Sequence, residues 1–136
     1  MLAVFDTGPL YAALDRDDDD HEACADLLRR RDLRPVIPAL VVAEVSYLAA
    51  TRLGAEVEAK FISGLSDLDV DSPPPQEYKR IAALILRYAN FPLGATDASV
   101  VALAERLQTP CVVTLDRRHF QAIKPSHCEA LQLLPE

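Results

Sequence analysis

Four acidic side chains stand at separated points of this 136-residue chain, each beside an apolar segment. Asp6 directly follows the apolar run Leu2–Phe5, and Asp116 directly follows the apolar run 111–115. Short apolar runs bounded by turn-forming residues are typical of buried strands. Because ligands of an open α/β sheet bind at the carboxyl ends of its strands, two parallel strands here would bring both aspartates to one sheet edge. Each aspartate taken alone is equally typical of a turn.

The other two carboxylates belong to predicted helices. The neighbours of Glu44 at three and four positions are largely apolar, which predicts that it lies on the packed face of its helix. A buried carboxylate is costly unless it is paired or binds a metal. Asp97 lies in the first turn of its helix, where it also borders an apolar face. Alternatively, Glu44 reaches solvent at the helix start and Asp97 merely favours the helix dipole.

A cluster of carboxylates repels itself unless a cation offsets the charge. Oxygen-only ligands suit Mg²⁺, with Mn²⁺ as a possible substitute. The chemistry that follows is phosphodiester hydrolysis, in which a divalent cation polarises a phosphoryl oxygen and activates water. We therefore predict a metal-binding and catalytic site made of Asp6, Glu44, Asp97 and Asp116.

The elements that must position these residues alternate between strands and helices. Predicted strands cover residues 2–5, 36–37, 68–70, 111–115 and, at an edge, 131–134. Predicted helices cover residues 9–14, 21–31, 40–51, 55–64, 76–88, 97–107 with Thr96 as N-cap, and 117–120. This alternation predicts right-handed crossovers and an α/β fold. We expect a single domain over residues 1–136, a three-layer sandwich with a central, mostly parallel sheet flanked by helices.

The composition is that of an ordinary folded domain, with 50% apolar and 26% charged residues, which excludes a disordered chain. No apolar run reaches the roughly 18 residues of a membrane span. The first residues lack the basic start and long apolar stretch of a secretory signal, so we expect a cytoplasmic protein without membrane contact. Three widely spaced cysteines, Cys24, Cys111 and Cys128, suggest buried apolar side chains, without a disulfide framework or a zinc site.

The net charge of −7 argues at first against a nucleic-acid partner, but its distribution weakens that argument. The segment 15–20 contains five aspartates and one arginine, and we interpret it as a solvated loop. Residues 72–136 carry seven basic and six acidic groups. A uniformly basic face is absent, yet a neutral-to-basic face beside an acidic pocket remains compatible with RNA.

The ordered acidic motifs resemble those of the PIN domain. The residues that carry the resemblance are Asp6-Thr7, Pro38 with Val42-Ala43-Glu44, Gly94-Ala95-Thr96-Asp97-Ala98 and Thr114-Leu115-Asp116. The segment from Thr114 to Phe120, the length and the order of elements look like those of VapC-type toxins of bacterial toxin–antitoxin pairs. The resemblance covers essentially the whole chain, and the ordered set of motifs is specific although each motif alone is weak.

The resemblance implies a PIN-like fold and a Mg²⁺-dependent endoribonuclease that cleaves structured RNA, such as tRNA or the ribosomal sarcin–ricin loop. It implies that Asp6 and Asp97 are the firmest metal ligands and that Glu44 and Asp116 complete the site. It also implies a VapB-like antitoxin as partner. The pocket charge suggests that the antitoxin inserts an arginine or lysine beside Asp6 and Asp97.

Further residues are candidates for RNA contacts. Thr7 and Thr114 can hydrogen-bond the carboxylates or the scissile phosphate, and Arg117, Arg118 and Lys124 can contact phosphates beside the pocket. His119 and His127 lack metal-ligand spacing and are predicted to be structural or surface residues. The apolar helices over residues 40–53 and 55–65 favour a homodimer.

Three other functions compete with cleavage. A receiver-type signalling domain has a similar size and an acidic pocket, but it expects an acidic pair after the first strand and a lysine after the last. A phosphatase with an aspartate nucleophile expects a second aspartate where Gly8 stands. A PIN-like module that binds without cleaving is the third alternative, and the complete set of four carboxylates argues against it.

Overall fold

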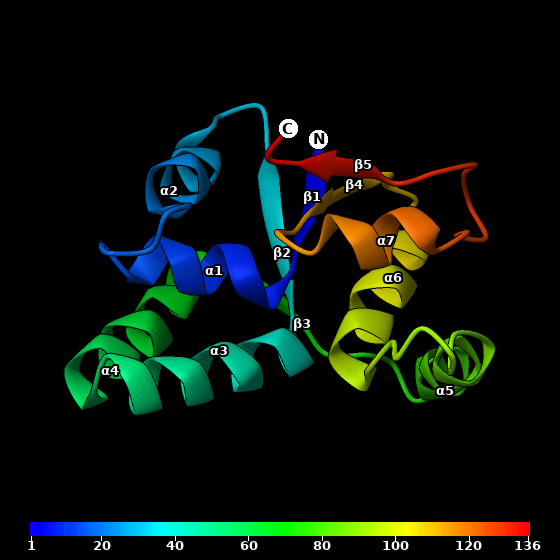
Figure 1. The fold of residues 1–136 in the computed structure, drawn as a ribbon, viewed down its shortest axis with the longest axis horizontal. Coiled ribbons are helices and arrows are strands. Elements are labelled where there is room, and N and C mark those ends of the chain that lie inside the picture. Colours follow the sequence, from blue (N-terminus) through cyan, green and yellow to red (C-terminus); the bar gives the residue numbers. More distant parts are fainter.

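Five strands form the centre of the computed structural model, which describes residues 1–136 (Figure 1). They are β1 (Leu2–Phe5), β2 (Arg34–Pro38), β3 (Asp69–Asp71), β4 (Cys111–Val113) and β5 (Gln132–Leu134). Their order across the sheet is β3–β2–β1–β4–β5, and all four pairings are parallel. The predicted α/β class and parallel sheet are confirmed, and the last strand lies at an edge as predicted.

Helices cover both faces of this sheet (Figure 1). On one side lie α1 (Thr7–Leu14) and α2 (His21–Arg29), and on the other lie α5 (Glu77–Arg87), α6 (Ala95–Leu107) and α7 (Arg117–Ala122). Beyond the carboxyl end of β1 lie α3 (Ala39–Arg52) and α4 (Ala55–Gly64), followed by a 3₁₀ turn at Leu65–Asp67. This three-layer arrangement matches the predicted sandwich and places α3 below the strand ends that carry the acidic residues.

The core includes the middle of the sheet, α6 and residues of α1, α2 and α3 such as Leu10, Leu27 and Val41. β1 and β4 are the middle of the sheet, and Val4, Phe5, Val112 and Val113 are fully buried. Residues 98–105 of α6 are buried without interruption. Strands buried on both faces consist of continuous apolar runs, which is why the sequence showed no alternation there. Dense packing holds α6 firmly in place, together with the acidic residue in its first turn.

Several element boundaries differ from the prediction by two residues. β4 ends at Val113 and not at residue 115, so Asp116 lies in a loop beyond the strand rather than directly at its end. The side chain of Thr114 accepts a hydrogen bond from the amide of Asp116 (2.9 Å), which turns the chain there. α6 begins at Ala95 with Gly94 as N-cap, so the predicted cap at Thr96 is wrong.

Two other helices, α1 and α3, also begin earlier than predicted, and α3 does so by one residue, at Ala39. α1 begins at Thr7, and Pro9 is tolerated in its first turn because the amide it lacks has no partner there.

Of the cysteines, Cys24 and Cys111 are buried as predicted, whereas Cys128 in the loop before β5 is only half-buried. No helix of the chain has both the length and the apolar character needed to span a bilayer.

Candidate active site

A pocket at the carboxyl end of the central strands contains all four predicted carboxylates. Its volume is about 480 Å³, and its lining consists of Asp6, Thr7, Gly8, Glu44, Leu48, Asp97, Leu115 and Asp116. The carboxylates come from four places in the chain: the end of β1, the middle of α3, the first turn of α6 and the loop after β4. The tertiary structure thus brings together the residues that the sequence analysis singled out.

Asp6 is the most deeply buried of the four, with 5% of its surface exposed. The Thr114 hydroxyl donates a hydrogen bond to Asp6 Oδ2 (2.9 Å), whereas Asp6 Oδ1 is buried without a hydrogen-bond partner. Burial raises the pKa of Asp6 despite the hydrogen bonds that stabilise its charge. An unpartnered buried oxygen is costly, and a bound cation would satisfy it.

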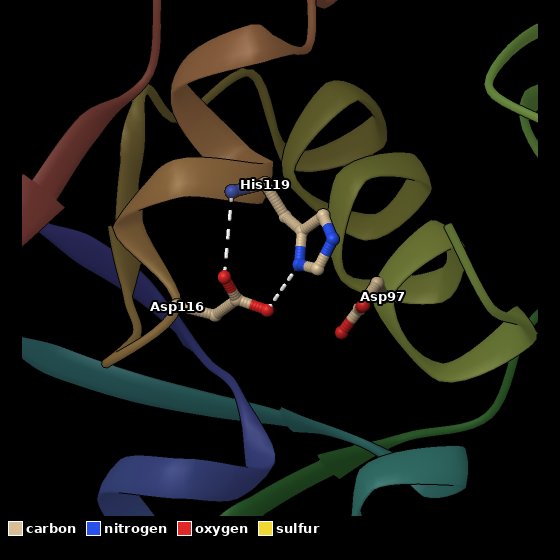
Figure 2. Close-up of side chains that lie close together, drawn as sticks. All are labelled: Asp97, Asp116 and His119. Carbon is tan, nitrogen blue, oxygen red and sulfur yellow. Dashed lines mark hydrogen bonds and ion pairs between the residues drawn. The ribbon is translucent and has the colours of Figure 1, made fainter. Parts of the chain in front are cut away.

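Asp97, Asp116 and His119 form the outer part of the site (Figure 2). Each offers a ligand atom, and these atoms all lie within 4.8 Å of one another. His119 Nδ1 contacts Asp116 Oδ2, and the His119 amide donates to Asp116 Oδ1 (3.4 Å). Figure 2 shows the imidazole reaching from α7 toward both aspartates.

The position of His119 corrects the sequence prediction, which separated this histidine from the site. Asp116 is the N-cap of α7, and a residue three positions after an N-cap faces back toward the cap. The three-residue spacing from a candidate site aspartate was therefore the signal that could have identified it. His127 fits the prediction of a structural role, since its Nε2 lies 2.7 Å from the Thr109 carbonyl oxygen.

The charge of Asp97 is strongly disfavoured by its surroundings. Burial raises its pKa to about 7, and the neighbouring carboxylates of Asp6, Asp116 and Glu44 act in the same direction. His119 opposes this shift only in part. Without a cation, the pocket therefore holds a carboxyl group that is protonated in part at neutral pH.

Glu44 lines the pocket, but the prediction that it lies on the packed face of its helix is wrong. Its side chain is exposed, and the packed face of α3 consists of Val41, Val45 and Ala49. Glu44 lies beside that face, on the side where Leu48 also lines the pocket. The apolar neighbours at helical spacing located the packed face of α3 only to within about one residue, and Glu44 falls just outside it. Pocket water, rather than a buried partner, can therefore hydrate this carboxylate.

The candidate phosphate contacts fall into different surroundings. Thr7 lines the pocket, and its Oγ1 is buried without a hydrogen-bond partner. Thr114 links Asp6 to the Asp116 loop through its hydroxyl. Arg117 donates to the carbonyl oxygens of Leu133 (3.4 Å) and Pro135 (2.8 Å), so the end of the chain engages it. Arg118 is exposed and forms no ion pair, and Lys124 is also exposed.

The donor set fits a hard divalent cation. Four carboxylates share one pocket, one buried oxygen lacks a partner, and no lysine or arginine pairs with Asp6, Glu44 or Asp97. Oxygen ligands of this kind suit Mg²⁺ or Mn²⁺. The geometry can therefore hold a cation against a bound phosphodiester.

Comparisons with known proteins agree with this architecture. The family model described as PIN domain matches residues 3–124. Ribonuclease VapC26 of Mycobacterium tuberculosis is 33% identical over 124 residues, which cover 90% of this chain and 92% of that protein. The sarcin–ricin-loop-cleaving toxin VapC20 of the same species has a TM-score of 0.74 at 14% identity, and the match covers 81% of this chain and 86% of that one.

A structure of a complex shares the fold over a larger part of the chain. VapBC2 from Rickettsia felis, bound to a DNA fragment from its promoter, has a TM-score of 0.71 at 18% identity and covers 98% of both chains. At these identities, the structural likenesses show the fold, whereas the match to VapC26 extends to the sequence.

Proposed function

The chain belongs to the PIN-domain family and is a relative of the VapC ribonucleases, and on that premise we propose that it is a Mg²⁺-dependent endoribonuclease, the toxin of a toxin–antitoxin pair. The observation that carries the proposal is the convergence of Asp6, Glu44, Asp97 and Asp116 on one pocket. The sequence relationship supports the nuclease activity, and the oxygen-rich pocket supports the metal requirement.

The roles of the residues follow from their surroundings. Asp6 and Asp97 would bind the cation most directly, and Asp116 and Glu44 would complete the site directly or through water. When bound, Mg²⁺ supplies positive charge that polarises the scissile phosphate and activates water. Thr114 holds Asp6 Oδ2 in place, and His119 orients Asp116, so both keep carboxylates aimed into the pocket.

The proposed substrate is a structured RNA, with tRNA and the ribosomal sarcin–ricin loop as the two candidates. Purified protein should cleave RNA with Mg²⁺ and lose this activity in EDTA, and the Asp6→Asn variant should be inactive while remaining folded. Cleavage that persists in the variant would contradict the assignment. RNA binding without metal-dependent cleavage would favour a non-catalytic module, and acquisition of a stable phosphoaspartate would favour a receiver-type signalling domain.

The cut site can be found without choosing the RNA in advance. Brief expression of the toxin in bacterial cells, followed by a transcriptome-wide map of new 5′ ends, should give one or a few dominant sites in tRNA or ribosomal RNA. We propose that the protein acts in the cytoplasm, where both RNAs are present. Uniform breakage of all transcripts would argue against a structured target.

We further propose that a VapB-like antitoxin covers the pocket. A carboxylate cluster creates a negative potential that a flexible cationic side chain complements. The exposed side chain of Tyr47 on α3, at 62% exposure, offers an apolar anchor near the same end of the sheet. Mutating the inserted arginine of the antitoxin should restore cleavage while largely preserving the complex. Inhibition that survives removal of every basic residue in that segment would contradict this mechanism.

The apolar surface of α3 and α4 also supports a homodimer. Tyr47 and Ile62 are 62% and 46% exposed, and only Phe61 is buried in α4. Exposed aromatic and aliphatic side chains of this size are typical of contact surfaces. Light scattering at micromolar concentration should give twice the monomer mass of 14.9 kDa, whereas a strictly monomeric mass would contradict the dimer.

A further inference from the structure

A second cavity is lined by His119, whose imidazole also contacts Asp116 of the carboxylate pocket. Its volume is about 300 Å³, and its lining consists of Asn90, Phe91, Pro92, Arg118 and His119. His119 joins the two cavities because its imidazole contacts Asp116 in the first and lines the second. A molecule bound in the carboxylate pocket can therefore extend into this cavity past one side chain.

The cavity contains the chemical groups that recognise a nucleotide. Arg118 is an exposed cation without an ion-pair partner, and a guanidinium binds phosphate oxygens in a bidentate manner. Phe91 is a half-buried aromatic ring, on which a base can stack. The exposed amide of Asn90 offers a donor and an acceptor to a base edge. No acidic residue lines this cavity.

The aromatic ring is held in a defined position. Its centroid lies 5.0 Å from that of His119, with an interplanar angle of 88°. The Phe91 amide donates to the Tyr88 carbonyl oxygen (2.9 Å), and the Tyr88 hydroxyl accepts from the Lys124 amide (2.9 Å). The loop after α5 is thus attached to the loop after α7. A fixed ring loses little freedom on binding, which favours stacking.

We propose that this cavity is a nucleotide subsite for the RNA, which binds the nucleotide adjacent to the scissile phosphate through stacking on Phe91 and a phosphate contact to Arg118. The inference rests on the ribonuclease function proposed above and assigns RNA positioning to residues outside the carboxylate cluster. Arg117 does not share this role, because the carbonyl oxygens of Leu133 and Pro135 engage it.

The test compares RNA binding and cleavage in point variants, with a sarcin–ricin-loop hairpin and total tRNA as probes. Arg118→Ala should weaken RNA binding by about tenfold. It should also lower the slope of log binding constant against log salt concentration by about one in magnitude, because one phosphate contact is lost. Phe91→Leu should weaken RNA binding by about tenfold, whereas Phe91→Trp should bind RNA like the wild type, because stacking needs an aromatic face. The matched control is Lys79→Ala, which removes an exposed cation on α5 and should bind RNA like the wild type.

Mg²⁺ titration calorimetry separates this subsite from the catalytic cluster. Arg118→Ala and Phe91→Trp should bind Mg²⁺ with unchanged affinity. The subsite is overturned if Arg118→Ala and Phe91→Leu bind and cleave RNA like Lys79→Ala, or if the wild type binds neither probe. A different result would contradict the nuclease function and leave the subsite intact. In that case the wild type binds RNA, Arg118→Ala binds it more weakly, and neither protein cleaves RNA with Mg²⁺.

Discussion

Two regions of this molecule treat buried carboxylates in opposite ways. Between α5 and α6, Arg80 binds Glu105 with two hydrogen bonds of 2.8 Å, and Arg106 Nε lies 2.7 Å from Glu77 Oε1. At the carboxyl end of β1, Asp6 is buried to a similar degree, at 5% exposure against 7% for Glu105, yet no arginine or lysine pairs with it.

The difference separates carboxylates that are paired within the fold from the carboxylates that we propose as cation ligands. Burial acts to raise the pKa of Glu105, but Arg80 and the Ser126 amide outweigh it and lower that pKa. Burial raises the pKa of Asp97 to about 7, and three neighbouring carboxylates add to the shift. The chain compensates the first charge internally and leaves the second without a partner, where we propose that a cation binds, at a cost to its own stability.

The largest effect is expected when a pocket carboxylate is removed. Asp97→Ala should lower the rate of RNA cleavage by about 1,000-fold, since cation chemistry supplies several kcal/mol and 1.36 kcal/mol corresponds to a factor of ten. Without Mg²⁺, its melting temperature should equal or exceed that of the wild type, because charge repulsion is relieved. Wild-type cleavage rates in Asp97→Ala would contradict the assignment of the site.

The corresponding change in the other region should reverse this pattern. Glu105→Ala leaves the Arg80 guanidinium without its partner and should cost about 2 kcal/mol of unfolding free energy, since breaking a buried ion pair is costly and Arg80 is partly solvated. Urea unfolding measures this loss. Cleavage below the melting temperature should remain close to the wild-type rate. A stable but inactive Glu105→Ala protein would break the comparison.

A smaller effect should follow from removing the link between the Asp6 and Asp116 segments. Thr114→Val keeps the volume of a fully buried side chain but removes the hydroxyl that donates to Asp6 and accepts from the Asp116 amide. We expect about a tenfold loss of Mg²⁺ affinity, as is typical when a group that orients a metal ligand is lost. Calorimetry measures it, with Thr114→Ser as the control that retains the hydroxyl.

The two regions should also respond to pH with opposite signs. Because the folded-state pKa of Asp97 is raised above 3.8, its contribution lowers the stability of the metal-free protein as pH rises from about 4 to about 7. Because the folded-state pKa of Glu105 is lowered below 4.5, its contribution is lost as pH falls below that value.

Thermal melts in EDTA from pH 3 to pH 8 test this difference. Asp97→Asn should flatten the decline between pH 4 and pH 7, and Glu105→Gln should weaken the acid-side loss. If Asp97→Asn and Glu105→Gln gave the same curve of melting temperature against pH, the two regions would not differ in how their charges are compensated.

The sequence alone was sufficient to predict which four acidic residues would meet at one pocket and which elements would carry them. The strand–helix alternation and the apolar runs before Asp6 and Asp116 predict a parallel sheet with acidic residues at one edge, because burial of each element leaves a local periodic pattern. The sequence predicted the ends of strands and helices less well. The end of β4 depends on a hydrogen bond of Thr114, and the start of α6 depends on Gly94 as N-cap. The pattern of apolar residues predicts neither of these features.

Only the tertiary structure decided which groups meet across elements. It placed Glu44 in solvent beside the packed face of α3, brought His119 onto Asp116, and turned Arg117 to the chain end while leaving Arg118 beside Phe91. It also paired Arg80 with Glu105, which lies 25 positions along the chain. A local sequence pattern reports whether a side chain is buried within its own element. The partner that compensates a buried charge depends on how the layers pack, and that packing brings together residues from distant segments.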